Sequence, residues 1–325
     1  MITQVSEVRD RINALAPHAR FAFLRDNWDD LRRAMPLFAP QGVNTFDAAL
    51  TTQMLASGLI VALQNKLAPL AAFTRDFSID RIKPLSAVQV PRAVSGGTAV
   101  ASATNFEDTT NFVGTIDNVS ITPLQYTVGA HLTNAELNSG FRLAQMVELK
   151  ACEMADSLKV LVNAIITTGN FTAPVNPCVA AAFGWDELKT LWGQLKKSPI
   201  KSILLDGEYY SQFLPTTSVN FDPANSRRFG WDGFFLDTLW TGATANTVGF
   251  ACGREAIAIC AGLPLSPTVP SPQLTENVVT VPGLNLSVAQ YTWASTATRT
   301  AWMTWDVMFG AAVGDGAAGV LIMSA

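Results

Sequence analysis

The stretch VSITPLQYTVGAHLTNAELNSGFRLAQMVELK, residues 119–150, changes from a strand pattern to a helix pattern within a few residues. Its first half carries the alternating apolar side chains that are typical of a strand. In its second half, Thr133 and Glu136 have the spacing of a capping box, which marks the first turn of a helix. The sequence therefore predicts that a helix starts at Thr133, directly after a strand.

This helix is expected to continue to Gly169, because glycine commonly ends helices. Apolar side chains recur along it at intervals of three and four residues, and polar side chains follow on another face. At 1.5 Å per residue the helix would be about 50 Å long, several times the average length. A coiled coil is the alternative, but the heptad spacing with charged flanking positions is not sustained. We therefore expect one helix that spans a whole domain.

The strand pattern in the first half of the stretch 119–150 is interrupted at Thr122-Pro123. Apolar side chains before and after this step would face opposite sides of a regular strand. A β-bulge there would restore a single apolar face, and bulges are among the few places where a strand accepts proline. Residues 86–130 are then expected to form a long two-stranded excursion with a small, polar tip at 95–113. Two strands alone are weakly stable, so the excursion needs a surface to lie against.

The rest of the chain is expected to form an arm at 1–45, an apolar helix at 46–67, a separate α/β lobe at 170–285 and closing strands at 286–325. In the lobe, GWDELKTLWGQLKKS predicts a helix and KSILL a strand, after which Asp206 can cap a short helix. Near the end, Asp315-Gly316 indicates a tight hairpin between two strands.

The low charge of the chain is the most informative feature of its composition. Charged residues make up 15% of the 325 residues, whereas soluble domains usually contain about 25%. A surface with so few charges is expected to be covered by copies of the same chain or by a partner, because large exposed apolar patches are rare on monomers. The net charge is −4 and no cluster of Lys and Arg occurs, which argues against binding nucleic acid through a basic surface.

A membrane is not expected to cover this surface, because the longest apolar runs of the chain fall far short of the roughly 20 residues that a bilayer requires. The N-terminal positions where a signal peptide would be apolar are occupied by the charged residues Glu7, Arg9, Asp10 and Arg11. The sequence therefore indicates a cytoplasmic chain.

The sequence offers little catalytic chemistry: no P-loop, H-E-x-x-H or G-x-S-x-G motif occurs. We therefore predict no catalytic, cofactor-binding or metal-binding residue, no cofactor and no enzymatic activity. His18 and His131 are expected to be structural or to face solvent. Asp306 could be an acid in a hydrophobic pocket, but an Asp that satisfies backbone donors at a strand end is the favoured interpretation.

Two further groups of residues invite a functional interpretation. The acids in DNWDDLRR, residues 26–33, could suggest a metal site, but acids followed by Arg are more typical of a solvated helix face. The four cysteines have no C-x-x-C spacing and lie in apolar surroundings, so buried thiols are expected; they are Cys152, Cys178, Cys252 and Cys260.

The order of these parts, from charged arm to closing strands, resembles the Hong Kong 97-type major capsid protein of tailed bacteriophages. The likeness is strongest in the C-terminal third, in GREAIAICAGLP (253–264), GLNLSVAQYTW (283–293) and RTAWMTWDVMFGAAVGDGAAGVLI (299–322). The last of these contains a D-x-x-x-G step, from Asp306 to Gly310. By order of elements the resemblance covers about 46–325.

The resemblance implies an α+β Hong Kong 97-type capsid fold with a peripheral sheet. Its parts would be an N-terminal arm (1–45), an arm helix and the lead-in to the peripheral domain (46–85), an extended β-hairpin loop (86–130), a spine helix in the peripheral domain (131–169), an axial α/β domain (170–285) and the closing strands of the peripheral domain (286–325). In this family the extended loop lies over a neighbouring subunit.

The implied function is that of a major capsid protein, which assembles into the pentamers and hexamers of an icosahedral phage head around double-stranded DNA. The implied partners are further copies of the chain, scaffolding and portal proteins, a decoration protein, and DNA through non-specific contacts; no membrane is implied. The protein would be assembled in the host cytoplasm and reside in the virion. Some relatives crosslink a lysine of the extended loop to a neighbour, but this chain has no lysine from 84 to 149.

Two other classes of function remain open at this stage. The chain could be another phage structural component, such as a tail or decoration protein. It could also be an enzyme with a site in the α/β lobe, around Asp206, Glu208 and Tyr209.

Overall fold

The computed structural model describes the larger part of the chain. The described residues are 12, 14–27, 45–83, 85–94, 115–132, 140–171, 178–195, 198–214, 230–237, 246–266, 274–295 and 300–325. The expected capping box at Thr133 and Glu136, the hairpin tip 95–113 and the acids that follow Asn27 lie outside them.

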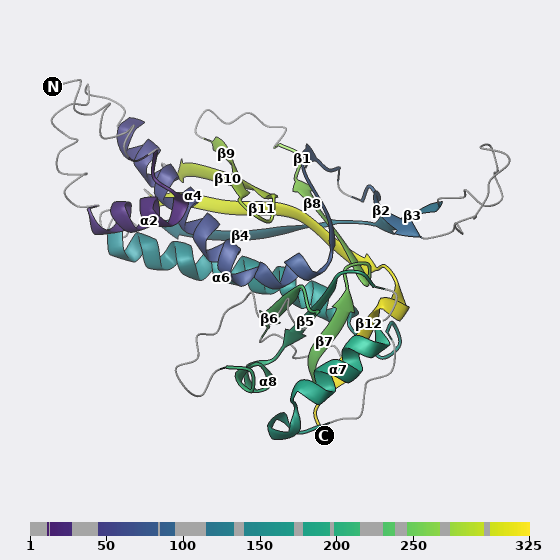
Figure 1. Ribbon diagram of the computed structural model, residues 1–325. Helices are drawn as coiled ribbons and strands as arrows, with labels where there is room; N and C mark the ends of the chain where they lie inside the picture. Colours follow the sequence, from purple (N-terminus) through teal and green to yellow (C-terminus); the bar gives the residue numbers. More distant parts are fainter. Residues whose placement is uncertain are drawn as a thin grey trace.

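The chain forms a mixed α and β structure with two lobes (Figure 1). The larger lobe contains a six-stranded sheet and a two-stranded hairpin. Its strands are β1 (Thr74–Arg81), β2 (Val88–Val94), β3 (Thr115–Ile121), β4 (Leu124–Leu132), β8 (Ile257–Leu263), β9 (Thr275–Val281), β10 (Leu286–Ser295) and β11 (Thr300–Val313). Its helices are α2 (Pro17–Asp26), α4 (Thr45–Lys66), the 3₁₀ turn η1 (Ala68–Ala72) and α6 (Gly140–Ile165).

The smaller lobe is built on a four-stranded sheet in the order β12-β7-β5-β6. The strands are β5 (Lys201–Leu205), β6 (Gly233–Leu236), β7 (Thr247–Gly253) and β12 (Gly319–Met323). The helical elements are η2 (Ala180–Ala182), α7 (Trp185–Gln194), α8 (Gly207–Ser211) and η3 (Gly316–Ala318). The expected helix and strand at the start of this lobe are therefore confirmed as α7 and β5.

Strand β11 organises the larger sheet because it pairs with three other strands. β4 pairs with residues 301–309 of β11, β10 with 300–306 and β8 with 308–313. A strand has only two hydrogen-bonding sides, so β10 and β8 must share the side opposite β4, one after the other along β11. β9 then extends the sheet beyond β10, and β1 extends it beyond β8 in parallel.

The main core lies between this sheet and the helices. Alternate side chains of β11, including Trp305, Val307 and Phe309, are fully buried in it. Helix α6 buries one stripe at three- and four-residue spacing, as its sequence pattern predicts. The buried residues of this stripe are Leu143, Ala144, Val147, Ala151, Met154, Ala155, Leu158 and Val162. At 1.5 Å per residue its 26 residues span about 39 Å.

Helix α6 ends at Ile165, four residues before the predicted end at Gly169. The backbone N–H of Ile166 bonds to the carbonyl of Asn163, and the side chain of Asn170 donates to the carbonyl of Ile165 at 2.8 Å. The amide of Asn170 therefore satisfies a carbonyl at the helix end, and glycine is not needed for this purpose.

The predicted bulge at Thr122-Pro123 is wrong, because the chain changes sheets there. β3 pairs with β2 in a separate hairpin, whereas β4 pairs with β11 in the main sheet. Ile121 packs with Val90 on one side of the main sheet, while Tyr126 packs in the main core on the other. The apolar side chains before and after Thr122-Pro123 therefore face opposite sides because they pack in two different layers. The two-stranded part of 86–130 ends at Ile121.

The predicted tight hairpin at Asp315-Gly316 is also wrong. β11 and β12 belong to different sheets and are joined through η3, where the Oδ1 atom of Asp315 accepts a hydrogen bond from the N–H of Ala317 at 2.9 Å. Two expected ranges change accordingly. β12 leaves the set of closing strands at 286–325 for the smaller lobe, and β8 and β9, expected within 170–285, lie in the larger sheet.

Candidate functional site

The two lobes are joined where two strand connections pass each other, from β7 to β8 and from β11 to β12. The N–H of Gly314 bonds to the carbonyl of Ala256 at 2.8 Å, and the N–H of Asp315 bonds to the carbonyl of Glu255 at 2.9 Å. A Cβ atom at Gly314 would collide with the Glu255 carbonyl, so the approach requires glycine. The connections therefore form a close, hydrogen-bonded joint.

A buried ion pair lies at a second contact between the lobes. Lys159, on α6, places its Nζ 3.0 Å from Oδ1 of Asp237, which follows β6, and the Nδ2 of Asn163 lies 3.3 Å from the other carboxylate oxygen. Lys159 and Asp237 are 5% and 1% exposed. Beside them a groove of about 360 Å³ is lined by the end of α4, η1 and β6. The groove therefore lies between elements of both lobes.

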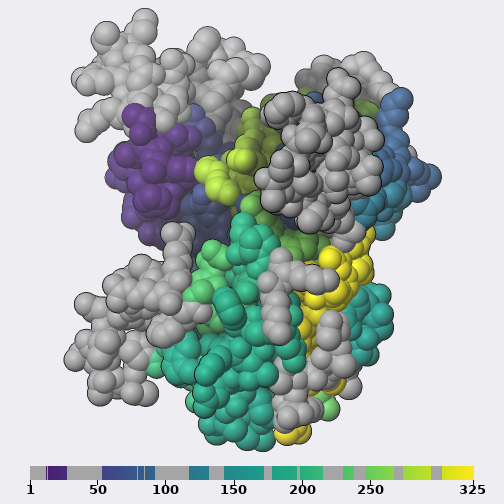
Figure 2. All heavy atoms as spheres, turned by 45° about the vertical axis from the view of Figure 1, so that its right-hand side comes forward, coloured from purple at the N-terminus to yellow at the C-terminus, as the bar shows by residue number. Residues whose placement is uncertain are grey.

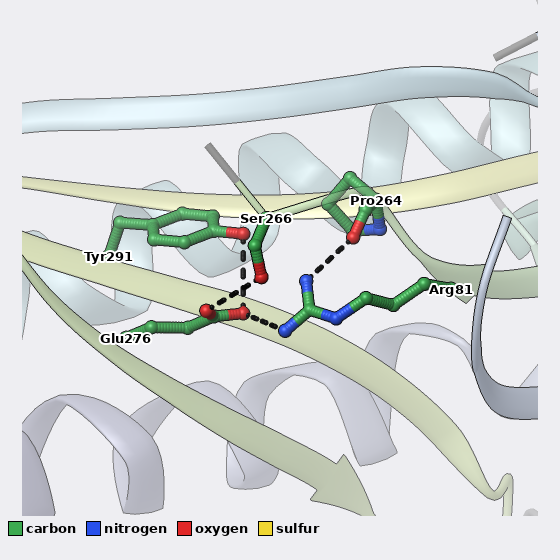
Figure 3. Close-up of polar contacts among 5 residues, drawn as sticks. All are labelled: Arg81, Pro264, Ser266, Glu276 and Tyr291. Atoms are coloured by element: carbon green, nitrogen blue, oxygen red, sulfur yellow. Dashed lines mark hydrogen bonds and ion pairs between the residues drawn. The ribbon is translucent and has the colours of Figure 1, made fainter. Parts of the chain in front are cut away.

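A polar cluster connects the strands that meet beside β11 (Figure 3). The Nη2 of Arg81 lies 2.5 Å from Oε1 of Glu276, and its Nη1 donates to the carbonyl of Pro264 at 2.9 Å. The hydroxyls of Ser266 and Tyr291 also donate to the carboxylate of Glu276, at 3.1 and 3.4 Å. These contacts connect the end of β1 and β8 to β9 and β10.

The environment of Glu276 favours its charged form. Burial alone would raise the pKa of Glu276, but hydrogen bonds from Arg81 and Ser266 and the charge of Arg81 outweigh it, so the pKa is lowered. The cluster is thus a partly exposed ion pair that holds two strand pairs together.

Asp306 lies in the middle of β11, and the prediction that it would end a strand is wrong. It is 8% exposed, and its Oδ2 accepts a hydrogen bond from the Nε2 of Gln125 on β4 at 2.9 Å. Burial raises its pKa, while hydrogen bonds from Thr127, Gln125 and Thr304 oppose the shift. Among the described residues, the geometry gives this carboxylate a hydrogen bond from Gln125 on β4 and none from the backbone donors that we predicted.

Both histidines are exposed, as expected. His18 lies on α2, and the ring of His131 on β4 lies 5.4 Å from that of Trp302 on β11. Trp302 in turn stacks on Trp293 of β10, with ring centroids 6.2 Å apart. This aromatic row across three strands was not predicted, because His131 is far from Trp293 and Trp302 in the sequence.

The three residues of the alternative enzyme site lie at the start of α8. The hydroxyl of Tyr209 donates to the carbonyl of Cys178 at 2.7 Å, and burial raises the pKa of this tyrosine, which disfavours a phenolate base. Asp206 occupies the N-cap position of α8 as predicted, but its side chain makes no capping hydrogen bond. Glu208 is exposed.

The prediction of buried thiols is correct for two of the four cysteines. Cys252 and Cys260 are buried, and burial raises the pKa of Cys260 to about 11. Cys152 and Cys178 are half-buried. All four are free thiols, and no three His, Cys, Asp or Glu side chains within the described residues are placed to hold a metal ion.

Several large apolar side chains are exposed on both lobes. On α6, Leu149 is 58% and Val160 48% exposed, although the opposite face of the helix is fully buried. On the smaller lobe, Val179, Trp185 and Leu214 are about half exposed. Among the described residues, no helix has the length and apolar character needed to span a membrane. The exposed apolar side chains of both lobes are candidate sites of contact with other proteins.

Comparison with known proteins gave matches only among solved structures. No family model and no curated protein matches the chain. A virus-like particle from Pyrococcus furiosus is 11% identical, with 82% of this chain and 97% of that chain covered and a TM-score of 0.48. The capsid of the native GTA particle is 13% identical, with 80% and 90% covered and a TM-score of 0.46. The structure titled Microbacterium phage Oxtober96 is 15% identical, with 79% and 91% covered and a TM-score of 0.45.

Proposed function

We propose that this chain is a major capsid protein that assembles with copies of itself into a closed icosahedral shell. The observation that carries the proposal is the hairpin of β2 and β3, which leaves the body of the subunit (Figure 1) and lies at its margin in Figure 2. Among the hairpin residues whose side chains are described, Val90 and Ile121 are buried, and they pack against Ala258 and Cys260 of β8. A two-stranded ribbon is weakly stable alone, so a neighbouring subunit is its expected support.

The surface of the subunit supports the same function. Only 15% of the residues are charged, and large apolar side chains are exposed on α6 and on the smaller lobe. Contacts with several neighbours would cover such a surface, and many weak contacts in one shell strengthen each other. The hydrogen-bonded joint between the lobes suits a subunit that must keep its shape in a shell.

The proposal assigns β2 and β3 to an extended loop, α6 to a spine helix, the larger lobe to a peripheral domain and the smaller lobe to an axial domain. Subunits would form pentamers and hexamers around double-stranded DNA, with scaffolding, portal and decoration proteins as further partners. A net charge of −4 fits a wall that encloses DNA without binding it tightly. Assembly would take place in the host cytoplasm, and the mature protein would reside in the virion.

The test is the size of the purified protein, measured by sedimentation velocity and electron microscopy with and without a co-expressed scaffolding protein. We expect rings or closed shells. A matched variant replaces residues 95–112 with a short Gly-Ser turn, and should keep its helix content and unfolding temperature while failing to close shells. A monomer at high concentration in physiological salt would contradict the proposal, and normal shells from the shortened variant would remove the role of the hairpin.

A further inference from the structure

Asp306 lies on the face of the larger sheet that points away from the main core. Its neighbours along β11, Trp305 and Val307, are buried in the main core, and successive side chains of a strand point to opposite faces. Two neighbours on its own face are apolar and buried: Met308 follows on β11, and Ala289 lies opposite on β10. Burial of a carboxyl group in such surroundings disfavours its charged form.

The carboxylate of Asp306 has few hydrogen-bond donors. The Nε2 atom of Gln125 donates to Oδ2 at 2.9 Å, whereas Oδ1 is buried and has no hydrogen-bond partner among the described residues. A carboxylate offers about four acceptor positions, so a single donor satisfies only part of a buried charge. Asp237 shows the contrast, because its buried carboxylate is held by the ammonium group of Lys159 and the amide of Asn163. The charged form of Asp306 is therefore only partly compensated.

No charged group within the described residues compensates Asp306. The titratable or charged side chains that β4, β10, β9, β8 and β1 place on this side of the sheet are His131, Tyr291, Glu276, Cys260, Asp76 and Arg81. In the described part of the chain none of these forms a hydrogen bond or ion pair with Asp306, and Arg81 is paired with Glu276. Burial raises the pKa of Asp306, and neighbouring polar side chains of β4 and β11 oppose this effect without cancelling it.

We propose that Asp306 is a proton-binding site of the larger sheet, which weakens the pairing of β4 with β11 when it is ionised and strengthens this pairing when it takes up a proton from solvent. A neutral carboxyl group costs less to bury than a carboxylate. Its added O–H can donate to the hydroxyl of Thr127, which lies directly opposite on β4. Gln125 and Thr127 are exposed, so solvent protons reach the β4 side of the group although Oδ1 itself is buried.

The direction of the pH effect follows from the raised pKa of Asp306. In the unfolded chain an aspartate titrates at about 3.9. Below this pH the carboxyl group is neutral in both states and carries no penalty. The loss of stability begins as the pH rises above the unfolded value and is complete above the folded pKa. Glu276, on the same face, has the opposite dependence because its pKa is lowered. Acidification therefore strengthens the sheet at Asp306 and weakens it at Glu276.

The first test follows the proton directly in the full-length protein. The infrared difference spectrum between the wild type and Asp306→Asn isolates the C=O band of the protonated Asp306 carboxyl group, and the midpoint of this band is followed with pH. Gln125→Met removes the donor to Oδ2 at similar volume, so it should move the midpoint upward. Gln89→Met on β2 is the matched control and should leave the midpoint unchanged, because the amide of Gln89 contacts Ser120.

The second test measures stability at about pH 4 and about pH 7. The change in unfolding temperature caused by Asp306→Asn should be more favourable at neutral pH than in acid, by about 2 °C or more. At neutral pH, Asp306→Asn should also slow amide hydrogen exchange in β4 relative to the wild type, while β5 of the smaller lobe exchanges as before. Glu276→Gln should show the opposite trend with pH.

Three results would overturn the site. These are a midpoint at or below about 3.9, an effect of Asp306→Asn on unfolding that is the same at both pH values, or stabilisation of the wild type by calcium chloride at neutral pH that Asp306→Asn abolishes, which would assign Oδ1 to a metal ion. If no Asp306 variant folds, subtracting the spectrum of Gln125→Met from that of the wild type yields the same band. The inference holds for a free subunit as well as for a shell, so its failure leaves the proposed function untouched.

Discussion

The Nζ atom of Lys159 lies 3.0 Å from Oδ1 of Asp237, and this contact joins helix α6 of the larger lobe to the end of β6 in the smaller lobe. Both side chains are almost completely buried, so the contact replaces part of the hydration that both charges lose. Asn163, one turn further along α6, donates to the same carboxylate. The relative position of the two lobes is therefore linked to one ion pair.

Replacing one member of this pair should be strongly destabilising. Lys159→Met removes the ammonium group that contacts the buried carboxylate of Asp237, and we expect a loss of about 3–5 kcal/mol in the free energy of unfolding. The measurement is guanidinium chloride unfolding of the unassembled subunit. The double variant Lys159→Met with Asp237→Leu should recover part of this loss in stability, because neither charge of the pair remains buried. A loss below about 1 kcal/mol for Lys159→Met would show that the pair is solvated.

The crossing of α4 and α6 depends on Gly58. A Cβ atom there would lie 2.5 Å from Cγ1 of Val147 and 2.8 Å from Cε2 of Phe21, both buried. Although alanine favours a helix by about 1 kcal/mol over glycine, the overpacking should exceed this gain, so we expect Gly58→Ala to destabilise the subunit by about 1–2 kcal/mol. Gly193→Ala in α7 is the matched control, since nothing lies within 4 Å of its added Cβ. Equal thermal stability of both variants would refute the close contact.

The Arg81 and Glu276 pair should give the fold a small dependence on pH. Because the pKa of Glu276 is lowered in the folded protein, its stabilising effect is present above the unfolded value of about 4.3 and is lost as the pH falls through the folded pKa. Both side chains are partly exposed, so we expect at most about 1 kcal/mol.

Glu276→Gln should therefore lower the unfolding temperature more at pH 6 than near pH 3. Glu153→Gln is the control for an exposed pair within one helix, with Lys150. The same loss for Glu276→Gln at both pH values would contradict an electrostatic role for Glu276 and would point to packing instead.

Assembled particles should contain no covalent ladder of subunits. No lysine occurs from residue 84 to 149, so the proposed extended loop lacks the amine that an isopeptide bond to a neighbour would require. We expect a single subunit band when mature particles are dissolved and run on a denaturing gel. Bands at multiples of the subunit mass that survive reducing agent would contradict this prediction.

The parts of the fold that carry their own local pattern could be predicted from the sequence. The apolar helix expected at 46–67 is α4 (Thr45–Lys66), and the stripe of α6 is recognisable because helix periodicity is a property of neighbouring residues. The same is true of α7 and β5, which lie within a short, strongly patterned segment.

The remainder depends on residues that are distant in the sequence. β1 was not predicted as a strand, because TRDFSIDR contains few apolar residues and is stabilised by pairing with β8, far along the chain. The cluster around Arg81 was missed for the same reason, since Glu276 is 195 positions away. The error at Asp315-Gly316 has another cause: the dipeptide indicates a turn, but not whether the strands on either side of it pair.

The position of β12 affects the order in which the chain can fold during synthesis. β12 pairs with β7 and contributes Val320 and Ile322 to the core of the smaller lobe, yet it is translated only after the whole of β11. Until then, β7 has an unpaired edge and that core is incomplete. The smaller lobe therefore cannot mature on the ribosome ahead of the larger one, as independent domains usually do. A nascent chain could therefore join a growing particle only after both lobes have folded.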